Sequence, residues 1–576
     1  MSDGSIRAAS ERGSHIQPHS LAEAASGDNT VDIIVDRLIA WGVEMIFGVI
    51  GDSVNPLMEA LRQRQHQIRF IAVRHEEAAA FMASGYAKYT GRLGACLATS
   101  GPGAVHLVNG LYDAAFDHVP VVAITGRPVH DLLGMQYVQD VDTVSLMRDV
   151  AKFNVAINGP QQALAVTDLA CRTALSTACV AHLTIAKDVQ LQTIADDPPS
   201  KKRGNLTGSA SWVPRIEIPT EEQLEAAASL LNAASRPMIL AGRGALAAKT
   251  EVEQVADCLG APAAMALLGR TLLAEDSPFS TGGIGDLGTL PSKLAGQECD
   301  ALLILGSTMP YLQYYPKPGQ ARCVQIDRDP THIGLRHSVE IGLVGDVQAT
   351  LRALLPKLRR RTDRSFLETA QSRMQEWRAT LSAVEAQRST PLKPQFLVAQ
   401  ISRLLEPNAI VSVDTGAHTI FCGRHLQLQP TQHLGVSGTL ASMGSGLPFA
   451  IAAKLAFPDR QSVALVGDGG FTMLMGDLIT AVKYKTPIKI VIFKNNSLAQ
   501  DAWEQSEVGQ EEFGAELEPI DFVKFGEACG VEAYRCTHPD EVEPVLKRAF
   551  GSPNVALVEA SVDPKEWPVK PDEVKA

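Results

Sequence analysis

The chain of 576 residues carries a formal net charge of −12 at pH 7, which argues against nucleic acid or an anionic membrane surface as the main partner. Its apolar content of 45% and charged content of 20% are ordinary for a globular protein of three or four domains. Nine cysteines without a Cys-x-x-Cys pair argue against a zinc or disulfide framework, and no apolar run reaches the roughly 20 residues of a membrane span. We therefore expect a cytoplasmic protein.

Residues 1–28 are polar and lack an apolar signal segment, so we expect a disordered tail there. From residue 29 onward, strand-like runs alternate with helical patterns, which is typical of α/β domains with parallel sheets. Polar stretches over 195–219 and 359–394 interrupt this alternation. The prediction is an α/β fold of three doubly wound parallel-sheet domains, over 29–195, 215–358 and 393–576.

In the first domain, a predicted strand over 46–52 ends in a glycine turn. A second strand over 68–73 leads into Glu76 and an alanine-rich helix over 78–88. An acid in the first turn of a helix favours the helix dipole, and this structural role is the local explanation for Glu76. Burial at a strand-to-helix junction would also suit a carboxyl group that exchanges a proton near neutrality. The local sequence leaves both roles open.

In the middle domain, a predicted strand over 237–241 is followed by Gly242-Arg243-Gly244-Ala245-Leu246-Ala247, which we expect to open a helix. The pattern G-x-G-x-x-A is a weak dinucleotide signal, and a tight strand-to-helix turn explains it equally well. A nicotinamide site would need an acid at the end of the next strand. That strand, over 261–268, ends instead in Gly269-Arg270, so a nicotinamide cofactor is disfavoured.

The third domain contains the most informative pattern. A predicted strand over 462–466 ends in Gly467-Asp468-Gly469, a helix follows near 471–484, and a second strand over 488–493 ends in Asn495-Asn496. A strand, helix and strand of this length form a βαβ unit, so Asp468 and Asn495 both lie at carboxyl ends of parallel strands, where ligands bind. Their oxygens suit Mg²⁺, and free N–H groups near Gly469 and Gly470 suit phosphate. Together these features predict a metal-diphosphate site.

This pattern resembles the signature of thiamine diphosphate-dependent enzymes. Over residues 30–570 the chain is similar to the pyruvate oxidase and quinone-dependent pyruvate dehydrogenase branch, with acetolactate synthase as the next relative. The similarity is carried by Gly48-Val49-Ile50-Gly51-Asp52, Arg74-His75-Glu76-Glu77, Ser100-Gly101-Pro102-Gly103 and Asn109-Gly110. The three domains then correspond to pyrimidine-binding, central FAD-type and diphosphate-binding domains.

The resemblance implies specific roles for several residues. Glu76 would activate the cofactor through its pyrimidine ring, Met443 would force the bent cofactor conformation, and Asp468, Asn495 and the Ser497 carbonyl would bind Mg²⁺. Glu76, Gln139 and Glu504 are the implied catalytic residues. Implied thiamine contacts are Gly51, Glu76, Ala441, Ser442, Met443, Asp468, Gly469, Gly470, Asn495, Asn496, Ser497, Leu498, Ala499, Gln500 and Asp501.

The same resemblance implies FAD in the middle domain. The segments that align with FAD contacts are Ile284-Gly285-Asp286-Leu287, Ser307-Thr308-Met309-Pro310-Tyr311 and Asp327-Arg328-Asp329-Pro330-Thr331-His332. Asp327 closes a predicted strand over 323–326, where its carboxylate could reach the adenosine end of the cofactor.

The chain departs from the family pattern near the reacting centre. Val138-Gln139 replaces Phe-Gln, and Ala499-Gln500-Asp501 replaces glycine followed by large apolar residues. Polar walls need hydrogen-bond partners, so the substrate would carry polar groups, unless Gln500 and Asp501 face water. The end of the chain lacks the amphipathic segment of membrane-bound relatives, so membrane activation is not expected.

The leading functional hypothesis is oxidative decarboxylation of a small 2-oxo acid, with pyruvate expected, using thiamine diphosphate, Mg²⁺ and FAD. The product would be acetate or acetyl phosphate, and the electron acceptor O2 or a quinone. The alternatives are an acetolactate synthase-like carboligase with a structural flavin, a non-catalytic cofactor-binding chain and, remotely, a nicotinamide dehydrogenase. The resemblance also implies a homodimer or homotetramer.

Overall fold

The computed structural model describes residues 27–196, 209–213 and 215–574. These residues fall into two compact units, one up to Arg215 and one from Ile216 onward. Residues 1–26 of the expected tail and residues 197–208 and 214 of the linker predicted over 195–219 lie outside the described residues. In the part of the chain that is described, no helix has the length and apolar character needed to cross a membrane.

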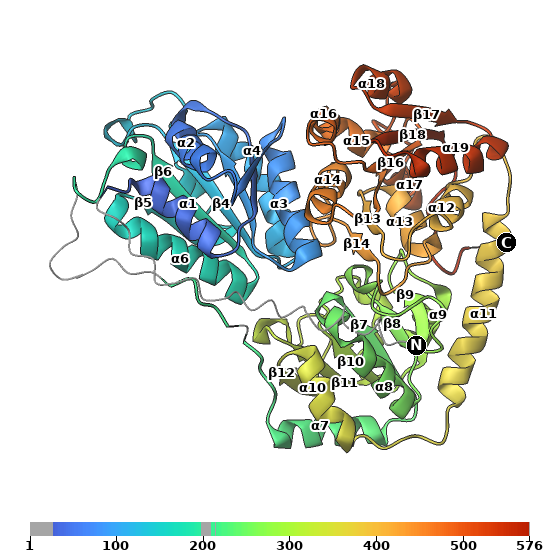
Figure 1. Cartoon of the computed structure of the whole chain (residues 1–576). Helices are drawn as coiled ribbons and strands as arrows, with labels where there is room; N and C mark the ends of the chain where they lie inside the picture. The colour runs from blue at the N-terminus through green and yellow to red at the C-terminus, as the bar shows by residue number, and fades with distance from the viewer. Residues whose placement is uncertain (1–26, 197–208, 214, 575–576) are drawn as a thin grey trace, which may run out of the picture. The chain divides into compact units, whose positions relative to one another are not determined.

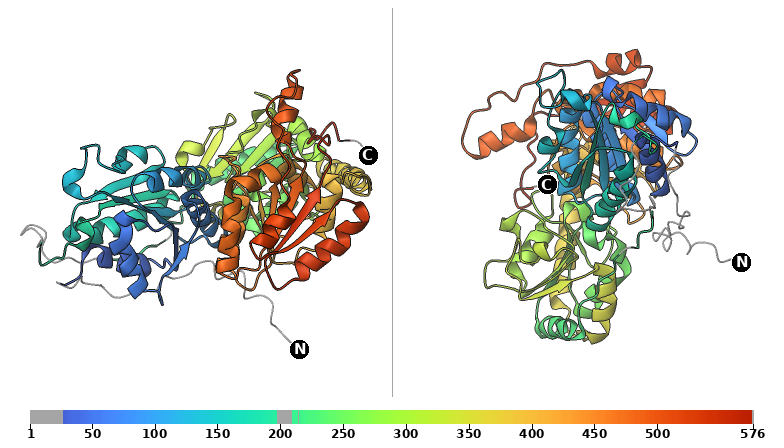
Figure 2. Two further views of the ribbon diagram at one scale, coloured as in Figure 1. Left: turned by 90° about the horizontal axis from the view of Figure 1, so that it is seen from above. Right: turned by 90° about the vertical axis from the view of Figure 1, so that its left-hand side faces the viewer.

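The first unit contains a six-stranded parallel sheet in the order β2-β1-β3-β4-β6-β5, coloured blue to teal in Figure 1. Helices cover both of its faces (Figure 2), which explains why strands such as Gly94–Ala98 are apolar throughout. The strands are β1 Met45–Gly48, β2 Arg69–Ala72, β3 Gly94–Ala98, β4 Val121–Arg127, β5 Ala151–Ile157 and β6 Val180–Ala186. The helices are α1 Thr30–Ala40, α2 Asn55–Gln63, α3 Glu76–Thr90, α4 Pro102–Phe116, α5 Thr143–Leu146 and α6 Pro160–Thr177.

The second unit contains two further six-stranded parallel sheets, and the first of them has the order β12-β11-β10-β7-β8-β9. Its strands are β7 Pro237–Ala241, β8 Ala263–Met265, β9 Ser280–Gly283, β10 Ala301–Leu305, β11 Arg322–Asp327 and β12 Ile341–Val344. The accompanying helices are α7 Glu221–Ala233, α8 Lys249–Leu259, α9 Leu290–Glu298, α10 Val347–Leu354 and the long α11 Ser365–Glu385.

The other sheet of this unit has the order β14-β13-β15-β16-β18-β17 and is orange to red in Figure 1. Its strands are β13 Ile410–Val413, β14 His433–Gly435, β15 Ser462–Gly467, β16 Lys489–Lys494, β17 Glu532–Cys536 and β18 Ala556–Ser561. Its helices are α12 Pro394–Ser402, α13 Ala417–His425, α14 Gly446–Ala456, α15 Asp468–Leu474, α16 Leu478–Lys483, α17 Ala499–Glu507, α18 Phe522–Ala528 and α19 Pro539–Gly551.

The three sheets confirm the predicted fold class. In each sheet the chain starts at an inner strand, adds strands on one side and then returns to add strands on the other. The direction therefore reverses between β1 and β3, between β7 and β10, and between β13 and β15. Ligands of doubly wound sheets bind outside the carboxyl ends of the strands at such reversals.

Some predicted elements have other bounds. The segment predicted to open a helix at 242–247 is a 3-10 helix over Arg243–Ala248, and α8 starts only at Lys249. The strand predicted over 261–268 is shortened to β8, because Leu267–Gly269 turns into a 3-10 helix. The helix predicted near 471–484 is divided into α15 and α16 by a 3-10 turn over Met475–Asp477. The domain boundaries predicted from the sequence stay predictions.

Candidate functional site

The carboxyl ends of β13 and β15 bring two buried acids together. β13 pairs with β15 in parallel, and the Asp414 backbone N–H donates to the Leu465 carbonyl across the two strands. Asp414 follows β13 directly, and Asp468 follows the last residue of β15. This is the point where the strand order of the sheet reverses, so the topology itself predicts a ligand site between these loops.

The Asp468 carboxylate organises the start of α15 and the loop after β16. Its Oδ1 accepts from the Gly469 backbone N–H at 3.0 Å, and its Oδ2 accepts from the N–H groups of Asn495 at 3.1 Å and Asn496 at 2.6 Å. A carboxylate offers about four acceptor positions, so about one position remains, on Oδ1, for a further ligand such as a cation. Burial raises the pKa of Asp468, and the backbone N–H donors partly oppose that shift.

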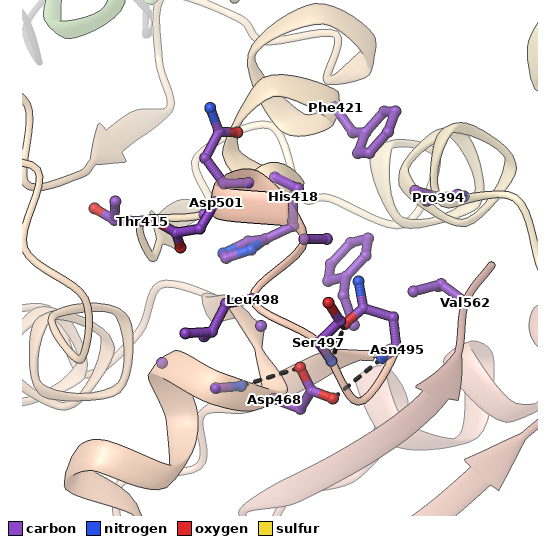
Figure 3. Close-up of a pocket in the computed structure, with 18 of the residues that line it drawn as sticks. Pro394, Thr415, His418, Phe421, Asp468, Asn495, Ser497, Leu498, Asp501 and Val562 are labelled. Atoms are coloured by element: carbon purple, nitrogen blue, oxygen red, sulfur yellow. Dashed lines mark hydrogen bonds between the residues drawn. The ribbon is translucent and has the colours of Figure 1, made fainter. Parts of the chain in front are cut away.

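The loop after β16 presents amide and carbonyl groups beside Asp468 (Figure 3). Asn495 Oδ1 accepts from the Ser497 N–H at 3.0 Å, and both residues line the same pocket as Asp468. The loop is held by two hydrogen bonds, from Leu498 N to the Ala515 carbonyl at 2.7 Å and from Leu517 N to the Asn496 carbonyl at 2.9 Å. These oxygen ligands, supplied by a fixed loop, suit a hard divalent cation.

Asp414 joins the end of β13 to the segment around Met443. Its carboxylate accepts from the backbone N–H groups of Thr415 at 2.9 Å and of Gly444 and Ser445 at 3.1 Å each. Burial raises its pKa to about 6 despite these bonds. A Cβ on Gly470 would lie 2.5 Å from Asp414 Oδ2, so glycine is required for α15 to approach this acid.

His418, near the start of α13, is a pocket residue that the sequence reasoning missed. Its ring stacks on Phe493 with 5.7 Å between centroids, and its Nε2 is buried without a hydrogen-bond partner among the described residues. Burial lowers its pKa to about 4, so the imidazole is neutral at pH 7. An unpaired polar atom of this kind requires a ligand or water. The sequence feature that could have identified His418 is the apolar strand over 410–413, which is followed by Gly416 and His418.

The pocket gathers most of the third-domain residues that the sequence predicted. Those that line it are Met443, Asp468, Gly469, Gly470, Asn495, Ser497, Leu498, Ala499, Gln500 and Asp501. Of the others, Asn496 contacts Asp468 through its backbone N–H, and Glu504 accepts from Gln500 Nε2 at 2.7 Å. Ala441 has a positive φ of 56°, and the Ser442 hydroxyl donates to the Met443 carbonyl at 3.1 Å.

Within the first unit, Glu76 is the first residue of α3. His75 caps this helix by accepting from the Glu77 N–H, and Gly91 ends it in the left-handed conformation. The buried Glu76 carboxylate lies 3.0 Å from His106 Nδ1 of α4, and the His106 ring stacks on His75 at 4.5 Å. Among the described residues, these three side chains have potential metal-binding atoms within 4.8 Å of one another.

Glu77 differs from its neighbour, because its Oε1 accepts from Asn109 Nδ2 at 2.7 Å. Gln139 lies in a loop with a φ of 61°, and its Oε1 accepts from the Ser100 hydroxyl at 3.1 Å. A Cβ on Gly51 would lie 2.4 Å from Thr99, so that position also requires glycine. The preceding residue of the Gln139 loop, Val138, is 72% exposed.

In the middle sheet, the reversal between β7 and β10 is closed by glycines. A Cβ on Gly242 would lie 2.5 Å from the Gly306 carbonyl, which brings the two loops into backbone contact just before Ser307. Asp327 ends β11, and its Oδ1 accepts from the Asp329 N–H at 3.0 Å and lies 3.2 Å from His332 Nδ1. The predicted FAD segments 307–311 and 327–332 thus lie at the carboxyl ends of the neighbouring strands β10 and β11, whereas the segment 284–287 follows β9 at one edge of the sheet.

Two further contacts define the segment 284–287 in the same unit. The Tyr314 hydroxyl donates to Asp286 Oδ1 at 2.7 Å, and Arg424 Nη2 of α13 donates to the Asp286 carbonyl at 2.7 Å. Nearby, the Arg270 side chain is 3% exposed, and a Cβ on Gly283 would lie 3.3 Å from Arg270 Cδ. Arg270 pairs with Glu275, but its Nε and Nη1 have no acceptor within the described part of the chain. Buried unpaired donors indicate space for an acceptor group.

Comparison with known protein families gives three matches along the chain. Residues 28–146 match the thiamine pyrophosphate enzyme N-terminal TPP binding domain, residues 224–354 the central domain, and residues 414–560 the C-terminal TPP binding domain.

Three relatives match over almost the whole chain. The protein YdaP of Bacillus subtilis is 38% identical over 92% of this chain and 91% of its own length. A pyruvate oxidase of Lactiplantibacillus plantarum is 33% identical over 90% of this chain and 85% of its own. A probable acetolactate synthase large subunit of Methanocaldococcus jannaschii is 32% identical over 93% of this chain and 92% of its own.

Proposed function

Because this chain belongs to the thiamine pyrophosphate enzyme family, we propose that it decarboxylates a 2-oxo acid and transfers the resulting electrons to FAD. Pyruvate is the expected substrate, acetate or acetyl phosphate the expected product, and O2 or a quinone the final acceptor. The observation that carries the proposal is the pocket in which Asp468, Asn495 and Ser497 adjoin the unpaired His418.

The residues of this pocket fit Mg²⁺ and a diphosphate. Asp468 retains about one acceptor position after its three backbone hydrogen bonds, and Asn495 and Ser497 add amide and carbonyl oxygens. The unpaired Nε2 of His418 can donate to a phosphate oxygen in the neutral tautomer that keeps its proton there. Gly469 and Gly470 also line the pocket and carry no side chain that would keep a phosphate away from the start of α15.

The bound thiamine would supply an electron sink that stabilises the carbanion formed when CO2 leaves. Glu76 would hold or release the proton that activates the pyrimidine ring, with His106 fixing its Oε2 at 3.0 Å. Gly103 keeps the other oxygen approachable, because a Cβ there would lie 3.2 Å from Glu76 Oε1. Met443, in the wall of the pocket, would support the bent cofactor.

FAD binding is supported by the donors and turns at the middle sheet. The contact between Gly242 and Gly306 resembles the close backbone approach that dinucleotide sites require, and Asp327 provides a carboxylate at the end of β11. The unpaired Nε and Nη1 of Arg270 provide a positive donor for an anionic part of the cofactor. The similarity to a pyruvate oxidase supports a flavin that accepts electrons.

A carboligase with a structural flavin is the second candidate, because the acetolactate synthase relative is almost as similar as the pyruvate oxidase. The two candidates differ in the fate of the electrons. Anaerobic addition of pyruvate to the purified protein should bleach the flavin absorbance if the leading proposal is correct. A flavin that stays oxidised while CO2 is released and acetolactate accumulates would favour the carboligase.

A second test uses the variant Glu76→Gln, which keeps the size of the side chain but removes the ionisable carboxyl. We expect CO2 release and flavin bleaching to fall by at least about 100-fold, in the range of general acid–base catalysis. Full activity of this variant would refute the thiamine mechanism. Light scattering of the same sample would test the proposed homodimer or homotetramer.

A further inference from the structure

The amide of Gln500 is held in one orientation by its neighbour on α17. Gln500 lies in the first turn of this helix, and its Nε2 donates to Glu504 Oε1 at 2.7 Å, between residues four apart on one helix face. An ionised carboxylate only accepts hydrogen bonds, so Nε2 and not Oε1 must face Glu504. The acceptor end of the amide is therefore directed away from Glu504.

That acceptor end is buried and unsatisfied. Gln500 Oε1 is shielded from solvent and has no donor among the residues that the structure describes, although Gln500 lines the pocket with Asp468 and Asn495. A buried acceptor without a partner is costly, so a working state of the pocket should bring a donor to it. The alternative that the sequence left open, in which Gln500 faces water, does not fit a shielded Oε1.

The surroundings indicate what kind of donor fits. Asp501, in the same turn, lines the pocket, as do Asp563 and Glu566, which pair with Lys393. The described residues that line the pocket therefore include several acids and no lysine or arginine, so the pocket carries negative charge. A second carboxylate on the substrate would be repelled there, whereas a neutral hydroxyl would be accepted.

We propose that the 2-oxo acid bound by this pocket carries a hydroxyl on C3, the carbon next to its keto group. Gln500 Oε1 accepts the hydrogen bond from this hydroxyl. This inference rests on the proposed function and makes a hydroxylated 2-oxo acid, in place of pyruvate, the preferred substrate. A hydroxylated substrate satisfies the unpaired acceptor, whereas the methyl group of pyruvate leaves it unpaired. Gln500 is then a specificity-determining residue in place of an apolar wall.

Two substrates of nearly equal size test this directly. 3-Hydroxypyruvate and 2-oxobutyrate differ only by a hydroxyl in place of a methyl group. We expect kcat/KM for CO2 release to be at least about tenfold higher for 3-hydroxypyruvate, because sites built around a substrate hydroxyl discriminate strongly against analogues that lack it. Equal or reversed values in the native protein would overturn the inference while leaving decarboxylation itself established.

Two variants locate the source of the preference. Gln500→Leu should bring the ratio of the two kcat/KM values close to one, mainly through a higher KM for 3-hydroxypyruvate. The matched control is Gln505→Leu on the same helix, whose side chain bonds the backbone of Phe513 and does not line the pocket. The control should keep the native ratio. A native ratio in Gln500→Leu would show that another group binds the substrate hydroxyl and would overturn the assignment to Gln500.

The failure of this inference can be told apart from failure of the proposed function. Calorimetric titration with Mg²⁺ and thiamine diphosphate reports whether each variant still forms the pocket. If the native protein binds the cofactor but releases CO2 from neither substrate nor from pyruvate, the proposed function is wrong and the substrate inference fails with it. If pyruvate is decarboxylated without preference for the hydroxyl, only the inference fails.

Discussion

Replacing Asp468 by asparagine should abolish tight cofactor binding, because the amide cannot reproduce all the contacts of the carboxylate. Three backbone N–H groups point at Asp468, one at Oδ1 and two at Oδ2. An asparagine must place its NH2 group at one of these two positions. At the Oδ1 position it loses the bond from Gly469 and sets a donor where the cation would bind. At the Oδ2 position it faces the N–H groups of both Asn495 and Asn496.

The size of the effect follows from these two choices. A hydrogen bond to a charged group contributes about 1.5–3 kcal/mol, so the second orientation costs about 3–6 kcal/mol and the first sacrifices a metal ligand. Since about 1.4 kcal/mol corresponds to tenfold in affinity, we expect Asp468→Asn to weaken binding of Mg²⁺ and thiamine diphosphate by at least about 100-fold. Isothermal titration calorimetry measures this, and circular dichroism checks that the fold is retained.

The matched control is Asp521→Asn. Asp521 caps α18 by accepting from the Lys524 N–H, and it does not line the pocket. Asparagine is as good a helix cap as aspartate, so this variant should bind the cofactor like the native protein. Binding by folded Asp468→Asn that stays within threefold of the native value would refute the metal-diphosphate assignment.

Two further predictions concern the neighbouring acid and histidine. Gly470→Ala should lower the free energy of unfolding by about 1–3 kcal/mol, because its Cβ would meet Asp414 Oδ2 at 2.5 Å; an unchanged urea midpoint would contradict the close approach. The pKa of His418 is lowered to about 4 in the folded chain, so as pH falls below its ordinary 6.5 the unfolded chain takes up the proton first. Protonation of His418 therefore costs no stability above pH 6.5. The free energy of unfolding falls by about 3 kcal/mol as the pH drops from 6.5 through 4. His418→Asn should therefore reduce the loss of stability of the cofactor-free protein between pH 7 and 4.5. If the free energy of unfolding falls with pH equally in the variant and the native protein, His418 does not titrate in this way.

The parts of the fold and site that could be predicted are those encoded by neighbouring residues. The apolar run before Asp468 indicates a strand covered on both faces, and the glycines after it indicate a turn into a helix. The spacing to Asn495 indicates one βαβ unit, whose parallel strands place both residues at the same edge of a sheet. Glu76 could be singled out because a family pattern, and not its local helix position, indicated its role.

Asp414, His418 and the orientation of Gln500 depend on the tertiary structure alone. Asp414 precedes Asp468 by more than fifty residues, and nothing in the local pattern states that β13 lies beside β15. Strand order is set by the packing of whole helices and strands, so it determines which loops meet at the reversal of the sheet. Likewise, the sequence identified Gln500 as a polar departure from an apolar wall. Only the contact with Glu504 decided which end of its amide is left unpaired in the pocket, because hydrogen-bond direction is a property of neighbours in space.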